Sequence, residues 1–391
     1  MATLTHPKTL TMATVSHDLT IEILRGLSVK DLLRFQCVSK LWCSSINDSY
    51  FIKLHLSDSL KTNTNHSLIL RKCGYDFVSF NYDSPKTTQR LNHPLGEQKK
   101  LLKILGSCNG LLALIDDDNR IFLWNPSTRK SQVLPSTEID FSSESIFFPR
   151  STYYGFGYDP ISGDYKLVRM VQLHGNNNGY LHSEAKVYSL RSNCWRRIKD
   201  FCFYLILYRK FGTLANNALH WMVFKTPESW KQNLVGFDLG TEEFRFLELP
   251  DLCLDKLFCY DIKAMGGYNC LTATYRDSND VVADVWIMKE YGVKESWVKL
   301  ISWNQPHLLP CFPSVVVVPL AFSKNGDKVL FSSDVHTFVW YDLGSKKVEK
   351  VGIRDVPIIH DVDLYVQSLV PLNTHALMIN NEMPPQVIFL P

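Results

Sequence analysis

Apolar and polar positions follow two different periods along this chain. From Val15 to Phe51, apolar residues recur every three or four positions, as they do on one face of a helix. They are Leu19, Ile23, Leu24, Leu27, Leu32, Phe35, Leu41, Trp42 and Ile46. The pattern predicts three short helices. So short a segment cannot bury a good core of its own, so we expect it to bury one face elsewhere.

Small polar residues mark the predicted helix ends. The Ser28 hydroxyl can accept a free N–H of the first turn, and Asp31 can reach back to it in a capping box. Ser39 is placed to begin the next helix, and Asn47-Asp48 to end it.

The polar stretch 57–66 is interpreted as a linker, and beyond it the pattern becomes that of β-strands. Strand–turn–strand segments recur at intervals of 64, 49, 50 and 54 residues when aligned on Trp124, Tyr188, Phe237, Ile287 and Tyr341. A period near 50 with about four strands per unit favours a kelch-like β-propeller of about six blades. A two-sheet sandwich, the alternative, would not need regular spacing. The first blade, around 67–95, is faint.

The composition of the chain excludes several classes of protein. A chain of 391 residues exceeds the usual limit of a single core. Its formal charge of +3, without a block of like charges, argues against nucleic acid as a partner. Ten scattered cysteines without a C-x-x-C pair indicate neither a zinc site nor a disulfide scaffold. No apolar run approaches the roughly 20 residues of a membrane span, so we expect no membrane insertion.

Catalytic motifs are weak throughout. Gly155-Phe156-Gly157 has the rhythm of a phosphate loop, but Pro160 stands where a third glycine belongs. His220, beside Trp221 in an apolar strand, is interpreted as a core histidine, and Asp116–Asp118 as a hairpin tip. We therefore expect no cofactor and no catalytic residue.

The front segment resembles a plant F-box. The matching residues are Asp18, Ile23, Leu24, Leu27, Val29, Lys30, Leu32, Arg34, Phe35, Cys37-Val38-Ser39-Lys40 and Trp42. The resemblance implies a helical module that binds a Skp1-type adaptor and, through it, a cullin-1/RING ubiquitin ligase. By matching positions, the adaptor would contact Leu19, Ile23, Leu24, Leu27, Val29 and Leu32. Val38 and Trp42 would instead hold the module together.

Two positions depart from the family's pattern. Ser16 and Ser28 stand where the family commonly has proline before the first and second helices. Serine can cap a helix, so the helices should form, but any contact that the prolines make with the adaptor is lost.

The remainder resembles the F-box-associated interaction domain of plants. The similar motifs are Gly106–Leu111, Trp124–Arg129, Tyr154–Asp159, Asp164–Lys166 and Leu219–Trp221. Further segments are similar to a subgroup, the constitutive expresser of pathogenesis-related genes type. That resemblance implies promotion of the degradation of plant immune receptors.

These observations predict a small all-α F-box of three helices at 15–56, a linker at 57–66 and an all-β propeller at 67–391, after a disordered segment at 1–14. Met12 is an alternative start to Met1. The resemblance implies a non-catalytic substrate-recognition subunit of an SCF (Skp1–cullin–F-box) E3 ubiquitin ligase, in the cytoplasm or nucleus. Tyr180 and Trp230, in polar loops, are the candidate substrate contacts. The alternatives are an S-locus-type F-box factor that targets ribonucleases and an interaction scaffold with a decayed F-box.

Overall fold

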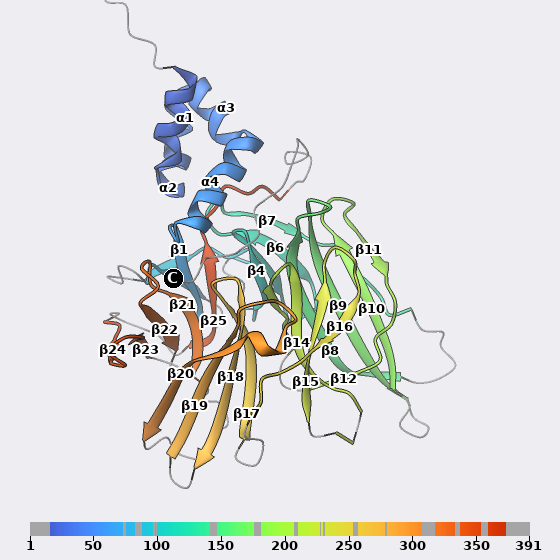
Figure 1. The fold of residues 1–391 in the computed structure, drawn as a ribbon. Helices are drawn as coiled ribbons and strands as arrows, with labels where there is room; N and C mark the ends of the chain where they lie inside the picture. The colour runs from blue at the N-terminus through green and yellow to red at the C-terminus, as the bar shows by residue number, and fades with distance from the viewer. Residues whose placement is uncertain are drawn as a thin grey trace, which may run out of the picture.

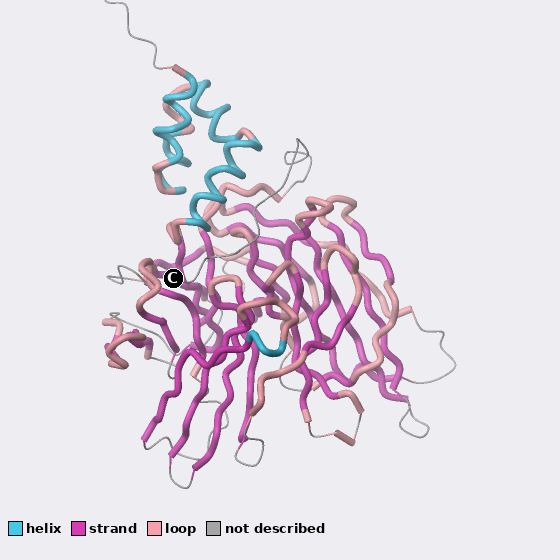
Figure 2. The backbone as a smooth tube through the Cα atoms, in the orientation of Figure 1, coloured by secondary structure: helices cyan, strands magenta, loops and turns pink. Residues whose placement is uncertain are grey.

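Four helices precede a ring of six β-sheets (Figure 1). The computed structural model describes residues 16–72, 76–82, 88–96, 98, 100–140, 147–175, 181–206, 210–226, 228–229, 231–252, 257–277, 280–306, 317–332, 337–352 and 359–372. Figure 2 separates the two parts by colour, with the N-terminal helices at one end of an otherwise stranded molecule. The predictions of disorder at 1–14 and of a start at Met12 lie outside the described residues.

The three predicted helices are present as α1 (His17–Arg25), α2 (Val29–Phe35) and α3 (Lys40–Asn47). A fourth helix follows directly, α4 (Ser49–Lys61). The predicted linker at 57–66 is therefore wrong over its first half. The polar residues Ser57 and Ser59 lie buried on α4, so the polar composition of this stretch did not indicate exposure. The next strand, β1, already begins at His66.

The six sheets are the predicted propeller blades. Blade 1 consists of β25 (Ile359–Val366), β1 (His66–Lys72), β2 (Phe77–Phe80) and β3 (Gln89–Leu91). Blade 2 consists of β4 (Lys103–Cys108), β5 (Leu111–Ile115), β6 (Ile121–Asn125) and β7 (Lys130–Val133). Blade 3 consists of β8 (Phe147–Asp159), β9 (Asp164–Gly175), β10 (Leu181–Ser189) and β11 (Cys194–Arg197).

Blade 4 consists of β12 (Tyr204–Leu205), β13 (Thr213–Ala215), β14 (Ala218–Phe224), β15 (Gln232–Asp238) and β16 (Phe244–Leu247). Blade 5 consists of β17 (Leu257–Met265), β18 (Tyr268–Asp277), β19 (Asp280–Met288) and β20 (Trp297–Pro306), with the 3-10 turn η2 (Lys294–Ser296) before β20. Blade 6 consists of β21 (Val318–Phe322), β22 (Lys328–Ser332), β23 (Phe338–Asp342) and β24 (Val348–Lys350).

The two ends of the described propeller meet in blade 1. Strand β25 pairs antiparallel with β1, with Leu68 opposite Leu364. The innermost strands β4, β8, β13, β17 and β21 contact one another in succession around the ring, and β25 contacts both β4 and β21. The last strand thus completes the first blade and closes the ring.

The positions used to align the repeat all fall on the third strand of a blade. Each of the five side chains is buried: Trp124, Tyr188, Phe237, Ile287 and Tyr341. In three blades the same strand ends in a turn capped by a side-chain oxygen. Asp238 accepts the N–H groups of Gly240 and Thr241, and Asn125 and Asp342 make the equivalent bonds. Apolar alternation and these short turns together produced the period of about 50 residues.

The ring has a helix-side rim and a far rim. The β4–β5 turn lies on the helix side, because Ser368 Oγ donates to Asn109 O at 2.8 Å and the neighbouring Leu369 shares a buried cluster with Leu56 of α4. The opposite ends of β4 and β5 pair Lys103 with Ile115. At about 3.3 Å per residue, that far rim lies roughly 17 Å away.

Candidate functional site

Serine caps position the first three helices. The Ser16, Ser28 and Ser39 hydroxyls accept the N–H groups of Leu19, Asp31 and Trp42 at 3.2, 3.2 and 3.1 Å. Ser28 Oγ also donates to the Asp31 carboxylate at 2.7 Å, so Asp31 holds the capping hydroxyl itself. The two serines that replace the family's prolines therefore begin helices, as expected.

The inner face of the helical module belongs to the chain's own core. Leu24, Val29 and Leu32 have no exposed surface, and they pack in one cluster with Ile46, Phe51, Ile52 and Leu56. These three residues were predicted to contact the adaptor, but in this structure they are buried in the chain's own core, and their contact with the adaptor stays a prediction. Leu27 is half-buried against the same cluster.

Two other residues predicted to contact the adaptor, Leu19 and Ile23, are exposed, as are three large apolar residues that were not assigned to this contact, Val38, Leu41 and Tyr50. The exposed fractions are 54% for Leu19, 49% for Ile23, 59% for Val38, 52% for Leu41 and 70% for Tyr50. We call these five residues the docking cluster. Val38 was expected to hold the module together and is instead exposed. Trp42 is half-buried and packs edge-on against Phe35 at 5.4 Å between ring centroids.

A sequence signal for the missed residues existed. Val38 stands just before the Ser39 cap of α3, Leu41 lies in the first turn of α3, and Tyr50 lies in the first turn of α4. All three are apolar residues at helix starts, but that position does not say which of them meet solvent.

Polar contacts fix α1 against α4. The Arg25 guanidinium donates to both oxygens of the Asp58 carboxylate, at 2.7 and 3.1 Å. The hydrogen bond to Asp58 raises the pKa of Arg25. His55 of α4 is buried, and its Nε2 lies 2.9 Å from Leu27 O. A carbonyl can only accept, so Nε2 carries the proton, and burial lowers the pKa of this histidine.

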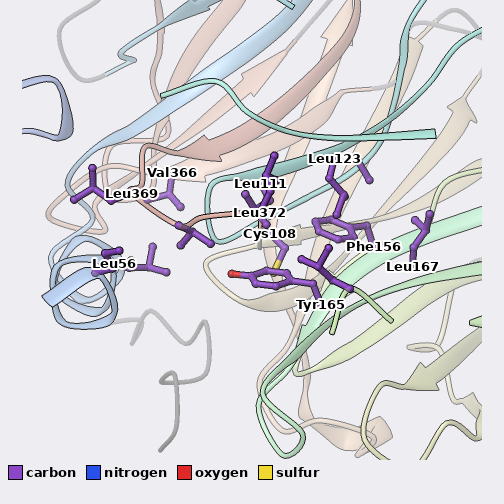
Figure 3. Close-up of a cluster of buried hydrophobic side chains, with 14 of the residues drawn as sticks. Leu56, Cys108, Leu111, Leu123, Phe156, Tyr165, Leu167, Val366, Leu369 and Leu372 are labelled. Atoms are coloured by element: carbon purple, nitrogen blue, oxygen red, sulfur yellow. The ribbon is translucent and has the colours of Figure 1, made fainter. Parts of the chain in front are cut away.

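The helical module is also joined to the propeller by packing. Figure 3 shows Leu56 of α4 facing Val366 and Leu369 of the C-terminal segment, with Leu372 beyond them. The same buried cluster continues into blades 2 and 3 through Cys108, Leu111, Phe156 and Tyr165. A continuous core makes the two parts one packed unit.

Hydrogen bonds reinforce that junction. The N–H of Gln367 donates to Asn65 O at 2.8 Å, and Asn65 Nδ2 donates to Ser59 Oγ of α4 at 2.8 Å. Asn63 and Asn65 both have positive φ, which asparagine tolerates better than most residues. The turn from α4 into β1 is therefore hydrogen-bonded both to α4 and to the C-terminal segment.

The predicted substrate contacts are not placed. Tyr180 and Trp230 lie outside the described residues, so both remain predictions.

The side chains considered for catalysis have structural partners. His220 is fully buried, with Nδ1 3.2 Å from Thr213 O and Nε2 2.9 Å from Tyr291 Oη. Burial lowers its pKa to about 4. Asp116 accepts two backbone N–H groups of its own hairpin tip and pairs with Arg120. Both agree with the interpretations made from the sequence.

Two further searches cover only the part of the chain that the structure describes. No group of three or more His, Cys, Asp or Glu side chains there could hold a metal ion. None of its helices has both the length and the apolar content needed to cross a membrane.

Comparisons with known proteins agree with this architecture. The family model of the F-box domain matches residues 15–54, and that of the F-box associated beta propeller domain matches residues 65–372. F-box protein CPR1 of Arabidopsis thaliana is 35% identical over 376 residues, which cover 92% of this chain and 89% of that protein. F-box protein At4g22390 of the same plant is 30% identical over 92% of this chain and 90% of its own length.

The F-box/kelch-repeat protein At3g23880 of Arabidopsis thaliana is 30% identical over 72% of this chain and 77% of that protein. The two family matches fall on the two parts that the structure separates, the helices and the ring. The chain therefore belongs to the F-box proteins that carry an F-box associated β-propeller domain.

Proposed function

We propose that this protein is the substrate-recognition subunit of an SCF-type E3 ubiquitin ligase. The observation that carries the proposal is the docking cluster: five large apolar side chains of the F-box that the rest of the chain leaves exposed. Only twelve large hydrophobic side chains are exposed among the described residues, so their concentration on the helices is far from even. An uncovered apolar surface of this kind is typical of a protein-binding site.

The apolar residues of the docking cluster suit a Skp1-type adaptor, which is the partner that an F-box implies. The adaptor would bridge the chain to cullin-1 and its RING subunit. The chain itself would contribute no chemistry, and its function would be to hold a target close to a ligase that acts on it.

Rigid packing between F-box and propeller supports this division of roles. A target bound to the ring would keep a fixed position relative to the adaptor, because Leu56, Leu369 and the Asn65 turn join the two parts. Loops on a rigid scaffold commonly carry the binding residues. We therefore assign target binding to the propeller.

For the target, we propose a plant immune receptor, as the resemblance to the constitutive expresser of pathogenesis-related genes type implies. An S-locus-type factor that targets ribonucleases is the second candidate on family grounds. A scaffold with a decayed F-box is disfavoured, because the serines at 16 and 28 cap their helices and the outer face remains apolar.

Affinity for recombinant Skp1 tests the proposal. The variant Leu19→Glu/Ile23→Glu places two charges in the docking cluster, and we expect its affinity to fall at least tenfold. Val348→Glu is the matched control: Val348 is 45% exposed on blade 6, far along the chain from the F-box, and its substitution should leave binding unchanged. Equal binding by both variants would contradict the proposed function.

A further inference from the structure

A cavity of about 300 Å³ opens on the far rim of the propeller. Blade 2 contributes Lys103 and the β5–β6 turn, blade 3 contributes Ser151, Thr152 and Tyr154 of β8, and Lys210 and Phe211 complete the wall. Strands β4 and β8 are the innermost strands of their blades. The cavity therefore lies toward the centre of the ring, on the side away from the docking cluster.

Backbone pairing makes this cavity a built feature. The N–H of Tyr154 donates to Lys210 O at 2.8 Å, and the N–H of Gly212 donates to Tyr154 O at 2.6 Å. Residues 210–212, which lie between β12 and β13 of blade 4, thus pair with the first strand of blade 3 in a parallel bridge. The positions of the Lys210 and Phe211 side chains follow from this pairing between blades.

Two lysines are the unpaired cations of the cavity wall, and Asp117 is an anion there that forms no ion pair with any residue that the structure describes. Asp116 is already paired with Arg120 at 2.7 Å, and Asp118 is paired with Lys100. The Asp117 carboxylate accepts the N–H of Leu101 at 3.2 Å. Lys103 and Lys210, by contrast, form no ion pair with any residue that the structure describes. The three aspartates and the four cations, Lys100, Lys103, Arg120 and Lys210, leave one positive charge in excess.

A buried hydroxyl points to a missing ligand. Ser151 lies on the cavity wall, is only 3% exposed, and its Oγ has no hydrogen-bond partner among the described residues. A buried polar group without a partner destabilises the fold, and such groups are rare in native proteins. A ligand atom in the cavity would satisfy this hydroxyl.

We propose that this cavity binds an anionic side chain of the target protein, a carboxylate or a phosphate. The ammonium groups of Lys103 and Lys210 attract the negative charge, and the Ser151 hydroxyl donates a hydrogen bond to one of its oxygens. Phe211, 37% exposed, covers the apolar stem of the same side chain. This inference rests on the proposed function, because it places the target on the propeller and names the chemistry that the propeller recognises.

The experiment selects phage-displayed random peptides on the full chain and then remakes the best binder in three forms. These carry glutamate, glutamine or phosphoserine at the selected position. We expect the selection to enrich Asp and Glu. The glutamate form should bind the Lys103→Glu/Lys210→Glu variant at least tenfold more weakly than it binds the unchanged protein. Lys347→Glu, an exposed lysine of the helix-side β23–β24 turn, is the control and should bind as the unchanged protein does.

The three peptide forms separate the sources of the charge. Tighter binding of phosphoserine than of glutamate assigns a phosphorylated target, and the reverse assigns an acidic one. Selection of neutral or basic peptides, selection of none, or full binding by the double variant each overturns the inference. Skp1 affinity, measured on the same double variant, should be unchanged. If the unchanged protein does not bind Skp1 at all, the proposed function is contradicted, while the peptide result still stands by itself.

Discussion

Two adjacent residues of α1 should separate folding from adaptor binding. Ile23 is 49% exposed in the docking cluster, whereas Leu24 has no exposed surface and packs against α4. Consecutive positions on a helix point about 100° apart, so Ile23 faces solvent and Leu24 faces the core. We therefore expect Ile23→Asp to impair binding alone and Leu24→Ala to impair the fold of the module.

The magnitudes follow from burial. Replacing a fully buried leucine by alanine costs about 2–5 kcal/mol, which is large beside a total stability of about 5–15 kcal/mol. For Ile23, full burial of the side chain contributes about 1.5–3 kcal/mol, and half of it remains to be covered by a partner. Losing roughly 1 kcal/mol and adding an aspartate that must be desolvated should weaken Skp1 binding at least tenfold.

Two assays read the two effects. Amide hydrogen exchange over residues 16–61 reports opening of the helical module, and calorimetry with recombinant Skp1 reports binding. Leu24→Ala should speed exchange throughout the module, and Ile23→Asp should leave exchange unchanged while lowering affinity. The reasoning would be refuted if the folded Ile23→Asp variant bound Skp1 within twofold of the unchanged protein, or if Leu24→Ala left exchange as it was.

Three further predictions concern the ring. Gly110 has φ of +82° and a Cβ there would lie 2.0 Å from Ser368 Oγ, so Gly110→Ala should lower the thermal midpoint by several degrees, whereas Gly352→Ala, with nothing within 4 Å, should not. Burial lowers the pKa of His66 and His220 to about 4. Between pH 6.5 and about 4 the unfolded chain binds protons that the native chain excludes, so the protein should become less stable as the pH is lowered through this range. A thermal midpoint that stays constant from pH 7 to pH 4.5 would contradict this. Ser151→Ala should leave the midpoint no lower, because it removes an unpaired hydroxyl, and yet weaken acidic peptides; a stability loss would show that Ser151 already has a partner.

Local signals in the sequence were enough to predict the first three helices and the repetition of the strands, but not α4. Caps such as Ser28 and Ser39, and third-strand positions such as Trp124 and Phe237, are local signals. A hydroxyl can accept the N–H three residues away, and strand alternation follows from the geometry of the strand itself. These signals act over a few residues, so they could be interpreted before any long-range contact was known.

Long-range packing determines which face of each helix meets solvent and where the ring closes. Ile23 and Leu24 are both apolar, and only Leu24 is buried, in the cluster that it shares with residues of α2, α3 and α4; Ser57 and Ser59 are polar and are buried nonetheless. The pairing of β25 with β1 joins the two ends of the described ring within blade 1, and the pairing of Lys210 with Tyr154 joins blade 4 to blade 3. Such contacts depend on how separate surfaces pack in three dimensions, and apolar spacing within one segment carries no information about its partner.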